Sequence, residues 1–258
     1  MHAISDSYNA NGYVVLKKFF SAHELKALHE CVSTFHELWL IDNADFYQQR
    51  AINSAYLSST KYLNTAQRSE LFAFVSSHKI MRLAHQVLQG NFAFLNTQLF
   101  FDPANSTQKN YWHRDAQYHL TLEQQKAMLT QPDVVHFRVP LVDEPGLELV
   151  PGSHKRWDSK EELDVRLERN GKTHPEPLSS GHVQALDAGD LMIFSANLIH
   201  RGLYSKTNNR LAFDFLFCPN DIKYAEFIDS DCLPTHEQLD NLEAPQVFKN
   251  AIDLKARM

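Results

Sequence analysis

Residues 111–119 read YWHRDAQYH and bring two histidines and one aspartate into a short stretch rich in aromatic residues. If the stretch is extended, the alternation of a strand places His113, Asp115, Gln117 and His119 on one face. His113 and Asp115 could then hold one metal ion from a single strand. Two protein ligands are too few for a catalytic metal, so we expect a further ligand from another segment.

That ligand is available at His200, which ends the apolar segment GDLMIFSANLIH. Two histidines and one carboxylate are the ligand set of non-haem iron(II) oxygenases, in which other coordination positions stay open. Such iron normally takes electrons from a keto-acid, whose far carboxylate needs a cation. Arg210 follows ten residues after His200 and could bind that carboxylate with its forked guanidinium group. A surface charge at the end of a strand is the alternative for Arg210.

The N-terminal part of the chain predicts helices that could support such a site. GYVVLKKFF (12–20) predicts a short strand, and Ser21 with Glu24 is typical of a capping box that starts a helix. Apolar residues then recur every three or four positions, which indicates one buried helix face. A second helical region is expected at about 68–89, so the N-terminal helices occupy about 21–90.

After Gly90 the apolar residues occur in short runs bounded by turn residues, which predicts strands. We expect these strands to form a jelly-roll core at about 92–218, with a short helix at 121–129 and a lid-like insertion at about 155–181. The strands are predicted at 92–101, 133–143, 147–153, 182–186, 190–195 and 210–217. The fold class is therefore mainly β with flanking helices (α+β), and the chain, 1–258, is expected to form a single domain.

The composition favours small-molecule chemistry. A formal net charge of −6 gives no excess of positive charge for binding nucleic acid or anionic membranes. No apolar run approaches membrane-spanning length, and the N-terminus lacks the pattern of a signal peptide. Cys31, Cys218 and Cys232 form neither a CxxC pair nor a disulfide framework, which suits a reducing compartment. We therefore expect a cytoplasmic protein without a nucleic-acid or membrane partner.

Five segments in order carry a resemblance to a known family: NGYVVLKKFFSAHELKAL, YWHRD, GLELVPGSHK, AGDLMIFSANLIHRG and the Arg210 that follows. From about residue 8 to 218 the chain resembles the phytanoyl-CoA dioxygenase family of iron(II)/2-oxoglutarate oxygenases. The resemblance implies a double-stranded β-helix core of the cupin-like jelly-roll type. It also implies iron held by His113, Asp115 and His200, and 2-oxoglutarate held through its distal carboxylate by Arg210.

The activity implied by the resemblance is hydroxylation of an unactivated C–H bond of a small metabolite. The reaction would consume O2 and 2-oxoglutarate and release succinate and carbon dioxide. A related branch halogenates and carries Ala or Gly in place of the aspartate. Asp115 fills that place, which favours hydroxylation or another oxidation over halogenation.

The chain departs from the family pattern near the cosubstrate. Many members carry a hydroxyl residue two positions after the second histidine, where this chain has Gly202, and the loop to Arg210 is about one residue shorter than is common. Cosubstrate binding is therefore expected to use other groups. Asn96 and Gln98 are candidates because they share one face of a strand, which either lines the lumen or faces water.

Four further side chains are candidates for substrate contact. His119 and Gln117 would share a face with the metal ligands in an extended stretch. Arg138 lies opposite an apolar stripe and could clamp an anionic group, unless its face is a solvated outer one. Asp214 is costly to bury alone, so it needs a partner, which is either a protein cation or a substrate amine.

Three other functions are compatible with parts of this pattern. HRD also occurs in the catalytic loop of protein kinases, but the chain has no Gly-rich loop and no lysine strand before it. A non-catalytic jelly-roll protein could bind a metal or metabolite as a sensor or scaffold. A hydrolytic or isomerising cupin-type metalloenzyme would use the same ligands without 2-oxoglutarate. The three ligands together with Arg210 favour the oxygenase.

Overall fold

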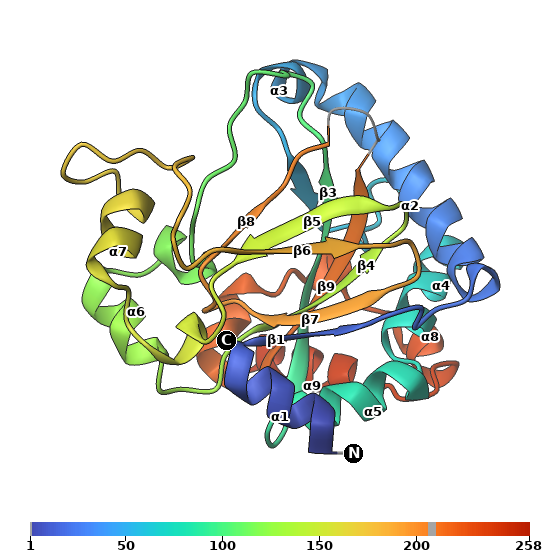
Figure 1. Cartoon of the computed structure of the whole chain (residues 1–258). Coiled ribbons are helices and arrows are strands. Elements are labelled where there is room, and N and C mark those ends of the chain that lie inside the picture. The colour runs from blue at the N-terminus through green and yellow to red at the C-terminus, as the bar shows by residue number, and fades with distance from the viewer. Residues whose placement is uncertain (1, 206–209) are drawn as a thin grey trace.

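Two antiparallel sheets form the centre of the molecule (Figure 1). A computed structural model describes residues 2–205 and 210–258 of the chain. Within these residues the larger sheet has six strands in the order β1-β7-β4-β9-β3-β2, which span Tyr13–Leu16, Leu191–Ser195, Val135–Pro140, Leu211–Pro219, Phe92–Phe101 and Asn53–Ala55. The smaller sheet has the order β6-β5-β8, with strands at His182–Leu186, Glu144–Leu149 and His200–Gly202. The predicted combination of helices with antiparallel sheets is present.

The strand register places polar side chains in rows on the inner face of the larger sheet. Gln98 of β3 lies opposite Asp214 of β9, and Asp214 lies opposite Arg138 of β4. Directly opposite residues in an antiparallel pair point to the same side, so these three side chains lie together. Asn96 of β3 and His136 of β4 belong to the next row on the same face.

Helices cover the outer face of the larger sheet. Phe213 and Phe215 of β9 point to this side and meet Phe74 at ring-centroid distances of 6.5 and 6.3 Å. Phe94 of β3 meets Phe248 at 4.9 Å. Full burial of each such ring contributes about 1.5–3 kcal/mol, which makes this layer the main apolar core. Its helices are α2, α4, α5 and α9, which span Ala22–Asp42, Thr65–Val75, His78–Val87 and Gln246–Ala256.

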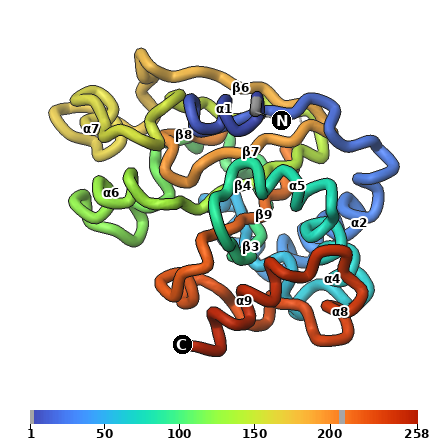
Figure 2. The backbone as a smooth tube through the Cα atoms, turned by 90° about the horizontal axis from the view of Figure 1, so that it is seen from below, coloured from blue at the N-terminus to red at the C-terminus, as the bar shows by residue number. Residues whose placement is uncertain are grey.

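Two short helices lie apart from this core. Figures 1 and 2 show α6 (Leu122–Met128) and α7 (Lys160–Arg166) on the side of the molecule away from α2 and α4. No described helix is long and apolar enough to cross a bilayer. The remaining helical segments are α1, α3 and α8 at His2–Asn11, Ala44–Gln49 and His236–Asp240, and the 3-10 segments η1 to η4 at Asp115–Tyr118, Ser153–Lys155, Ile222–Phe227 and Ser230–Cys232.

The structure corrects several predicted elements. The helical region expected at about 68–89 is two helices, α4 and α5, because Ser77 between them is extended (φ −61°, ψ 145°) and occupies the N-cap position of α5 without a side-chain capping hydrogen bond. The helix α1 and the strands β2 and β8 were not predicted. β2 and β8 have three residues each, which is too short for apolar alternation to be visible in the sequence.

Gly146 provides a test of this architecture. It lies at a bulge in β5 with φ +81°, and an added Cβ would be 1.9 Å from the carbonyl oxygen of Gln184. Gly90 has a similar φ of +70°, but a Cβ there meets no described atom within 4 Å. We expect Gly146→Ala to lower the free energy of unfolding by about 1–3 kcal/mol more than Gly90→Ala, measured by urea denaturation. Equal losses would contradict the register of β5 against β6.

Candidate metal centre

Three side chains from two segments form a cluster that can hold a metal. His113, Asp115 and His200 each offer one ligand atom, and these atoms lie within 4.8 Å of one another. Asp115 Oδ1 is 3.4 Å from His113 Nε2 and 3.7 Å from His200 Nε2. His113 and His200 also exchange two backbone hydrogen bonds of 3.0 Å, which extends the smaller sheet beyond β8. The sheet therefore fixes the distance between ligands that are far apart in the sequence.

The Nδ1 atoms of both histidines face backbone carbonyl oxygens. The Nδ1 atom of His113 lies 3.2 Å from the carbonyl oxygen of Tyr111, and that of His200 lies 2.9 Å from the carbonyl oxygen of Leu198. A carbonyl only accepts hydrogen bonds, so Nδ1 carries the proton and Nε2 keeps a free lone pair. Burial, together with the neighbouring His113, lowers the pKa of His200 to about 3, so this ring is neutral at neutral pH.

The carboxylate of Asp115 uses its two oxygens differently. Oδ1 faces the two histidines, and Oδ2 accepts a 2.8 Å hydrogen bond from Nε2 of His136. Burial would favour the neutral acid, but contacts with His113 and His136 hold the pKa of Asp115 well below its usual range. One ionised oxygen is thus left for a metal. The donor set of two neutral imidazoles and one carboxylate oxygen fits iron(II).

His136 connects Asp115 to a second buried carboxylate. Its Nδ1 lies 3.2 Å from Oδ2 of Asp214, and burial alone would lower its pKa, but the hydrogen bonds with the two carboxylates raise it to about 9. Asp214 also accepts from Nε and Nη2 of Arg138 at 2.8 and 3.1 Å. The partner expected for Asp214 is therefore present within the protein, and Arg138 lies on a buried inner face rather than a solvated one.

Arg210 lies buried beside the same lumen. Its Nε donates to Glu144 Oε2 at 2.7 Å, while its Nη2 has no hydrogen-bond partner among the described residues. An added Cβ at Gly202 would be 2.9 Å from Arg210 Nη1, so the guanidinium group occupies the space that a side chain at position 202 would need. A side chain at this position would therefore require the end of Arg210 to shift.

Arg138 and Arg210 share an aromatic neighbour. Their guanidinium carbons lie 4.3 and 5.7 Å from the centre of the Phe100 ring. Nη1 of Arg138, like Nη2 of Arg210, is buried without a hydrogen-bond partner in the described part of the chain. Buried unpaired donors are costly, so the lumen presents two sites for an anionic oxygen. Asn96 and Gln98 belong to the inner face nearby, and the Asn96 side-chain oxygen accepts from the Thr97 amide at 2.7 Å.

The structure corrects the expected course of residues 111–119. Asp115–Tyr118 forms the 3-10 segment η1 instead of continuing as a strand, so the predicted shared face is lost after Asp115. Gln117 turns away and bonds to Arg166 Nη1 at 2.7 Å. His119 is exposed and lies 5.3 Å from the Phe227 ring. Substrate contact by Gln117 and His119 stays a prediction, but these residues do not share a strand face with the metal ligands.

Sequence reasoning missed four buried charged residues around the site. Their positions become meaningful only through partners that are distant in the sequence. His136 has such a signal in part, because it shares a strand face with Arg138. The residues are Arg114, His136, Glu144 and Asp158.

Comparison with known proteins assigns the chain to a family. The family model described as phytanoyl-CoA dioxygenase (PhyH) matches residues 8–210 of the 258. The chain belongs to the phytanoyl-CoA dioxygenase family. A search of curated proteins finds no match to it.

Solved structures share the fold of this phytanoyl-CoA dioxygenase family member. HygX from Streptomyces hygroscopicus, solved with nickel and 2-oxoglutarate, has a TM-score of 0.62 at 16% identity, over 85% of this chain and 87% of that one. EctD from S. alaskensis, with 2-oxoglutarate and 5-hydroxyectoine, has 0.58 at 16% identity, over 83% and 74%. The α-ketoglutarate-dependent carbocyclase SnoK from nogalamycin biosynthesis has 0.55 at 15% identity, over 86% and 85%. The predicted jelly-roll fold class is confirmed.

His136 offers a direct test of the metal centre. The change His136→Phe keeps the ring that stacks on Phe194 at 4.5 Å but removes the hydrogen bonds to Asp115 and Asp214. Because partners of metal ligands typically contribute 10–100-fold to metal affinity, we expect the dissociation constant for cobalt(II) to rise by about that factor, measured by titration calorimetry. His85→Phe, a change beside the Phe92 ring, serves as the control. An unchanged affinity in folded His136→Phe would refute the role of this hydrogen bond.

Proposed function

We propose that the protein is an iron(II)- and 2-oxoglutarate-dependent dioxygenase that hydroxylates an unactivated C–H bond of a small metabolite. The observation that carries this proposal is the pairing of two features in one lumen. One is the cluster of two histidines and one carboxylate, a ligand set that leaves coordination positions open. The other is a pair of buried guanidinium nitrogens, Arg138 Nη1 and Arg210 Nη2, that have no hydrogen-bond partner among residues 2–205 and 210–258. A binding protein that held only a metal would need no such anion site.

The charges of the lumen support the same conclusion. Three carboxylates face three cations, so the protein groups balance one another before anything binds. The charges of iron(II) and the 2-oxoglutarate dianion also sum to zero, so the charge balance of the lumen is kept when both are bound. The carboxylates are Asp115, Asp214 and Glu144, and the cations are His136, Arg138 and Arg210.

Arg210 is the proposed anchor of the cosubstrate. Glu144 holds its Nε, which leaves the outer edge of the guanidinium group for the distal carboxylate. Gly202 supplies no hydroxyl group, so Asn96 and Gln98 on the inner face are the proposed additional donors. Arg138 shares the Phe100 ring with Arg210, and its Nη1 has no hydrogen-bond partner in the described part of the chain, so we propose that it binds an anionic group of the substrate or cosubstrate.

The protein's part in the reaction is to position the metal and the cosubstrate and to exclude water. His113, Asp115 and His200 would hold iron(II), which with 2-oxoglutarate and O2 supplies the oxidising power and releases succinate and carbon dioxide. The side chains of β3, β4 and β9 line the inner face of the jelly roll and orient the cosubstrate. We propose that the substrate enters near a cavity of about 510 Å³ lined by residues of η1, α6, α7 and the loops beside them, including Tyr118, Arg166 and, beyond α7, His174.

Hydroxylation is the proposed outcome rather than a consequence of the fold. SnoK shares the fold at low identity and is described as a carbocyclase. The outcome depends on how the substrate C–H bond is held. Asp115 supports oxidation over halogenation because it fills the ligand position that an Ala or Gly would leave vacant for a halide. We further propose that residues 1–258 act as one oxygenase unit.

The metal and cosubstrate can be tested together without knowing the substrate. Iron(II) and 2-oxoglutarate added under anaerobic conditions are expected to produce a visible charge-transfer band in the wild type. Asp115→Ala removes one of the three ligands, and we expect the band to be lost. A wild type without the band, or a variant that retains it, would reject the assignment. A screen of metabolite pools for succinate release separates the two functions, because a non-catalytic sensor would release none.

A separate prediction concerns the anchor. Arg210→Gln removes a charge-assisted hydrogen bond of about 1.5–3 kcal/mol, so we expect the affinity for 2-oxoglutarate to fall about 10- to 100-fold. The loss is measured by titrating 2-oxoglutarate into the iron-loaded protein and following the same band. Arg156→Gln is the matched control, since Arg156 also pairs with a glutamate, Glu162, outside the lumen. An equal effect in both variants would contradict a specific anchor.

A further inference from the structure

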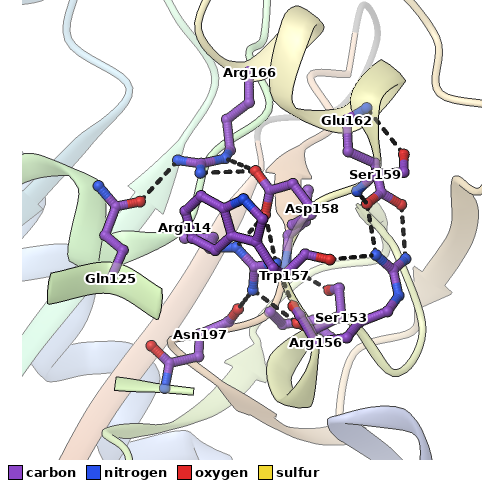
Figure 3. A network of polar contacts seen from close by, with 12 residues as sticks. Arg114, Gln125, Ser153, Arg156, Trp157, Asp158, Ser159, Glu162, Arg166 and Asn197 are labelled. Carbon is purple, nitrogen blue, oxygen red and sulfur yellow. Dashed lines mark hydrogen bonds and ion pairs between the residues drawn. The ribbon is translucent and has the colours of Figure 1, made fainter. Parts of the chain in front are cut away.

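A buried aspartate outside the metal cluster joins the insertion to the metal-ligand segment. Figure 3 shows Asp158 between the guanidinium groups of Arg114 and Arg166. Asp158 Oδ1 accepts from Nε and Nη2 of Arg114 at 3.0 and 2.7 Å. Its Oδ2 accepts from Nε of Arg166 at 2.8 Å. The side chains of all three are at most 1% exposed, so this is an Arg–Asp–Arg cluster removed from water.

Arg114 ties this cluster to both metal-ligand segments. It stands between His113 and Asp115 in the sequence, and its Nη1 donates to the carbonyl oxygens of Ser153 and Asn197, the first at 2.8 Å. Asn197 precedes His200 by three residues. One guanidinium group therefore connects the segment that carries two ligands with the segment that carries the third.

The carbonyl contacts of Arg114 depend on a counter-charge. A buried guanidinium without a paired anion is strongly destabilised, and Asp158 is the carboxylate that pairs with it directly. Nη2 of Arg114 also donates to the carbonyl of Arg156 at 3.1 Å, so the insertion contributes both a charge and a backbone acceptor. The guanidinium carbon of Arg114 lies over the Trp157 ring, 6.0 Å from the ring centre.

Arg166 extends the cluster to the turn after the ligands. Its Nη1 donates to Gln117 Oε1 at 2.7 Å and to Gln125 Oε1 at 3.1 Å. Gln117 Oε1 in turn accepts from the Arg114 amide at 3.3 Å. η1, α6 and α7 are thus joined around one buried carboxylate, and the turn that follows Asp115 is held from the insertion side.

We propose that Asp158 is a positioning residue for the metal centre, acting through Arg114 to fix the backbone that carries His113 and Asp115. This rests on the metal role proposed above for His113, Asp115 and His200. The first part of the insertion, 155–167, then belongs to the framework of the metal site, and any lid movement is confined to the residues beyond α7. Opening the whole insertion would separate Asp158 from Arg114 and leave both charges unpaired.

The test compares metal affinity with stability in the full chain. Asp158→Asn keeps the shape of the side chain and removes its charge. We expect the dissociation constant for cobalt(II), followed by visible absorption, to rise about tenfold or more, as for partners of metal ligands. Circular dichroism and thermal unfolding report whether the variant is folded. A folded Asp158→Asn that binds cobalt(II) as the wild type does would overturn the proposal.

Two variants separate positioning from a general effect of the insertion. Asp164→Asn makes the same change six residues later, where the carboxylate pairs with Lys160 and Asn170, and is expected to leave the cobalt(II) affinity unchanged. A loss in Asp164→Asn equal to that in Asp158→Asn would reject a specific role for Asp158. Arg166→Met keeps the Arg114–Asp158 pair. Its affinity for cobalt(II) is therefore expected to fall by less than that of Asp158→Asn, even if the melting temperature of the variant falls.

A further variant decides the question if Asp158→Asn does not fold. Arg114→Lys keeps a positive charge for Asp158 but loses the fork that reaches Ser153 and Asn197. It is expected to weaken cobalt(II) binding about tenfold, and native affinity in this variant would overturn the proposal. A wild type that binds no cobalt(II) would instead reject the metal centre itself, so the two failures are distinguishable.

Discussion

The hydrogen bond from His136 to Asp115 determines which carboxylate oxygen faces the two imidazoles. A carboxylate has two equivalent oxygens, and in the lumen only Oδ1 is directed toward His113 and His200. The other oxygen is held by an imidazolium ring that Asp214 stabilises from its far side. The ligand geometry therefore depends on a chain of paired charges that ends at Arg138.

Paired burial of charge recurs throughout the site. Glu144 pairs with Arg210, and Asp158 pairs with Arg114 and Arg166, each with little or no exposure to water. Such pairs contribute little net stability compared with apolar packing, but breaking one is costly. They are consistent with a lumen in which orientation matters more than stability, because the aromatic layer under the helices supplies the apolar core.

The fold also bears on position 202, where the family pattern led us to expect a hydroxyl residue. Gly202 makes room for the guanidinium group of Arg210, and Glu144 holds that group from the other side. A Cβ added at 202 would lie 2.9 Å from Nη1 of Arg210, so the guanidinium group would have to shift. The departure is thus part of one local arrangement and does not by itself argue against cosubstrate binding.

The sequence alone determined the features that depend on short-range order. The spacing of His113 and Asp115, the capping box at Ser21 and the strand at 92–101 follow from local periodicity and agree with the structure. The sequence also indicated that Asp214 needs a partner, because a lone buried carboxylate is costly.

Only the tertiary structure decided the pairings. His136 meets a carboxylate 21 residues before it and another 78 residues after it, and the insertion reaches Arg114 across 44 residues. Strand register places His136 near Asp214, and register depends on the packing of whole sheets rather than on neighbouring residues. Arg114, Asp115 and Asp158 lie outside the described strands, so the packing of loops against the sheets brings them to their partners. For the same reason the stretch YWHRDAQYH looked extended throughout, although Arg166 and Gln117 help to hold it as a turn after Asp115.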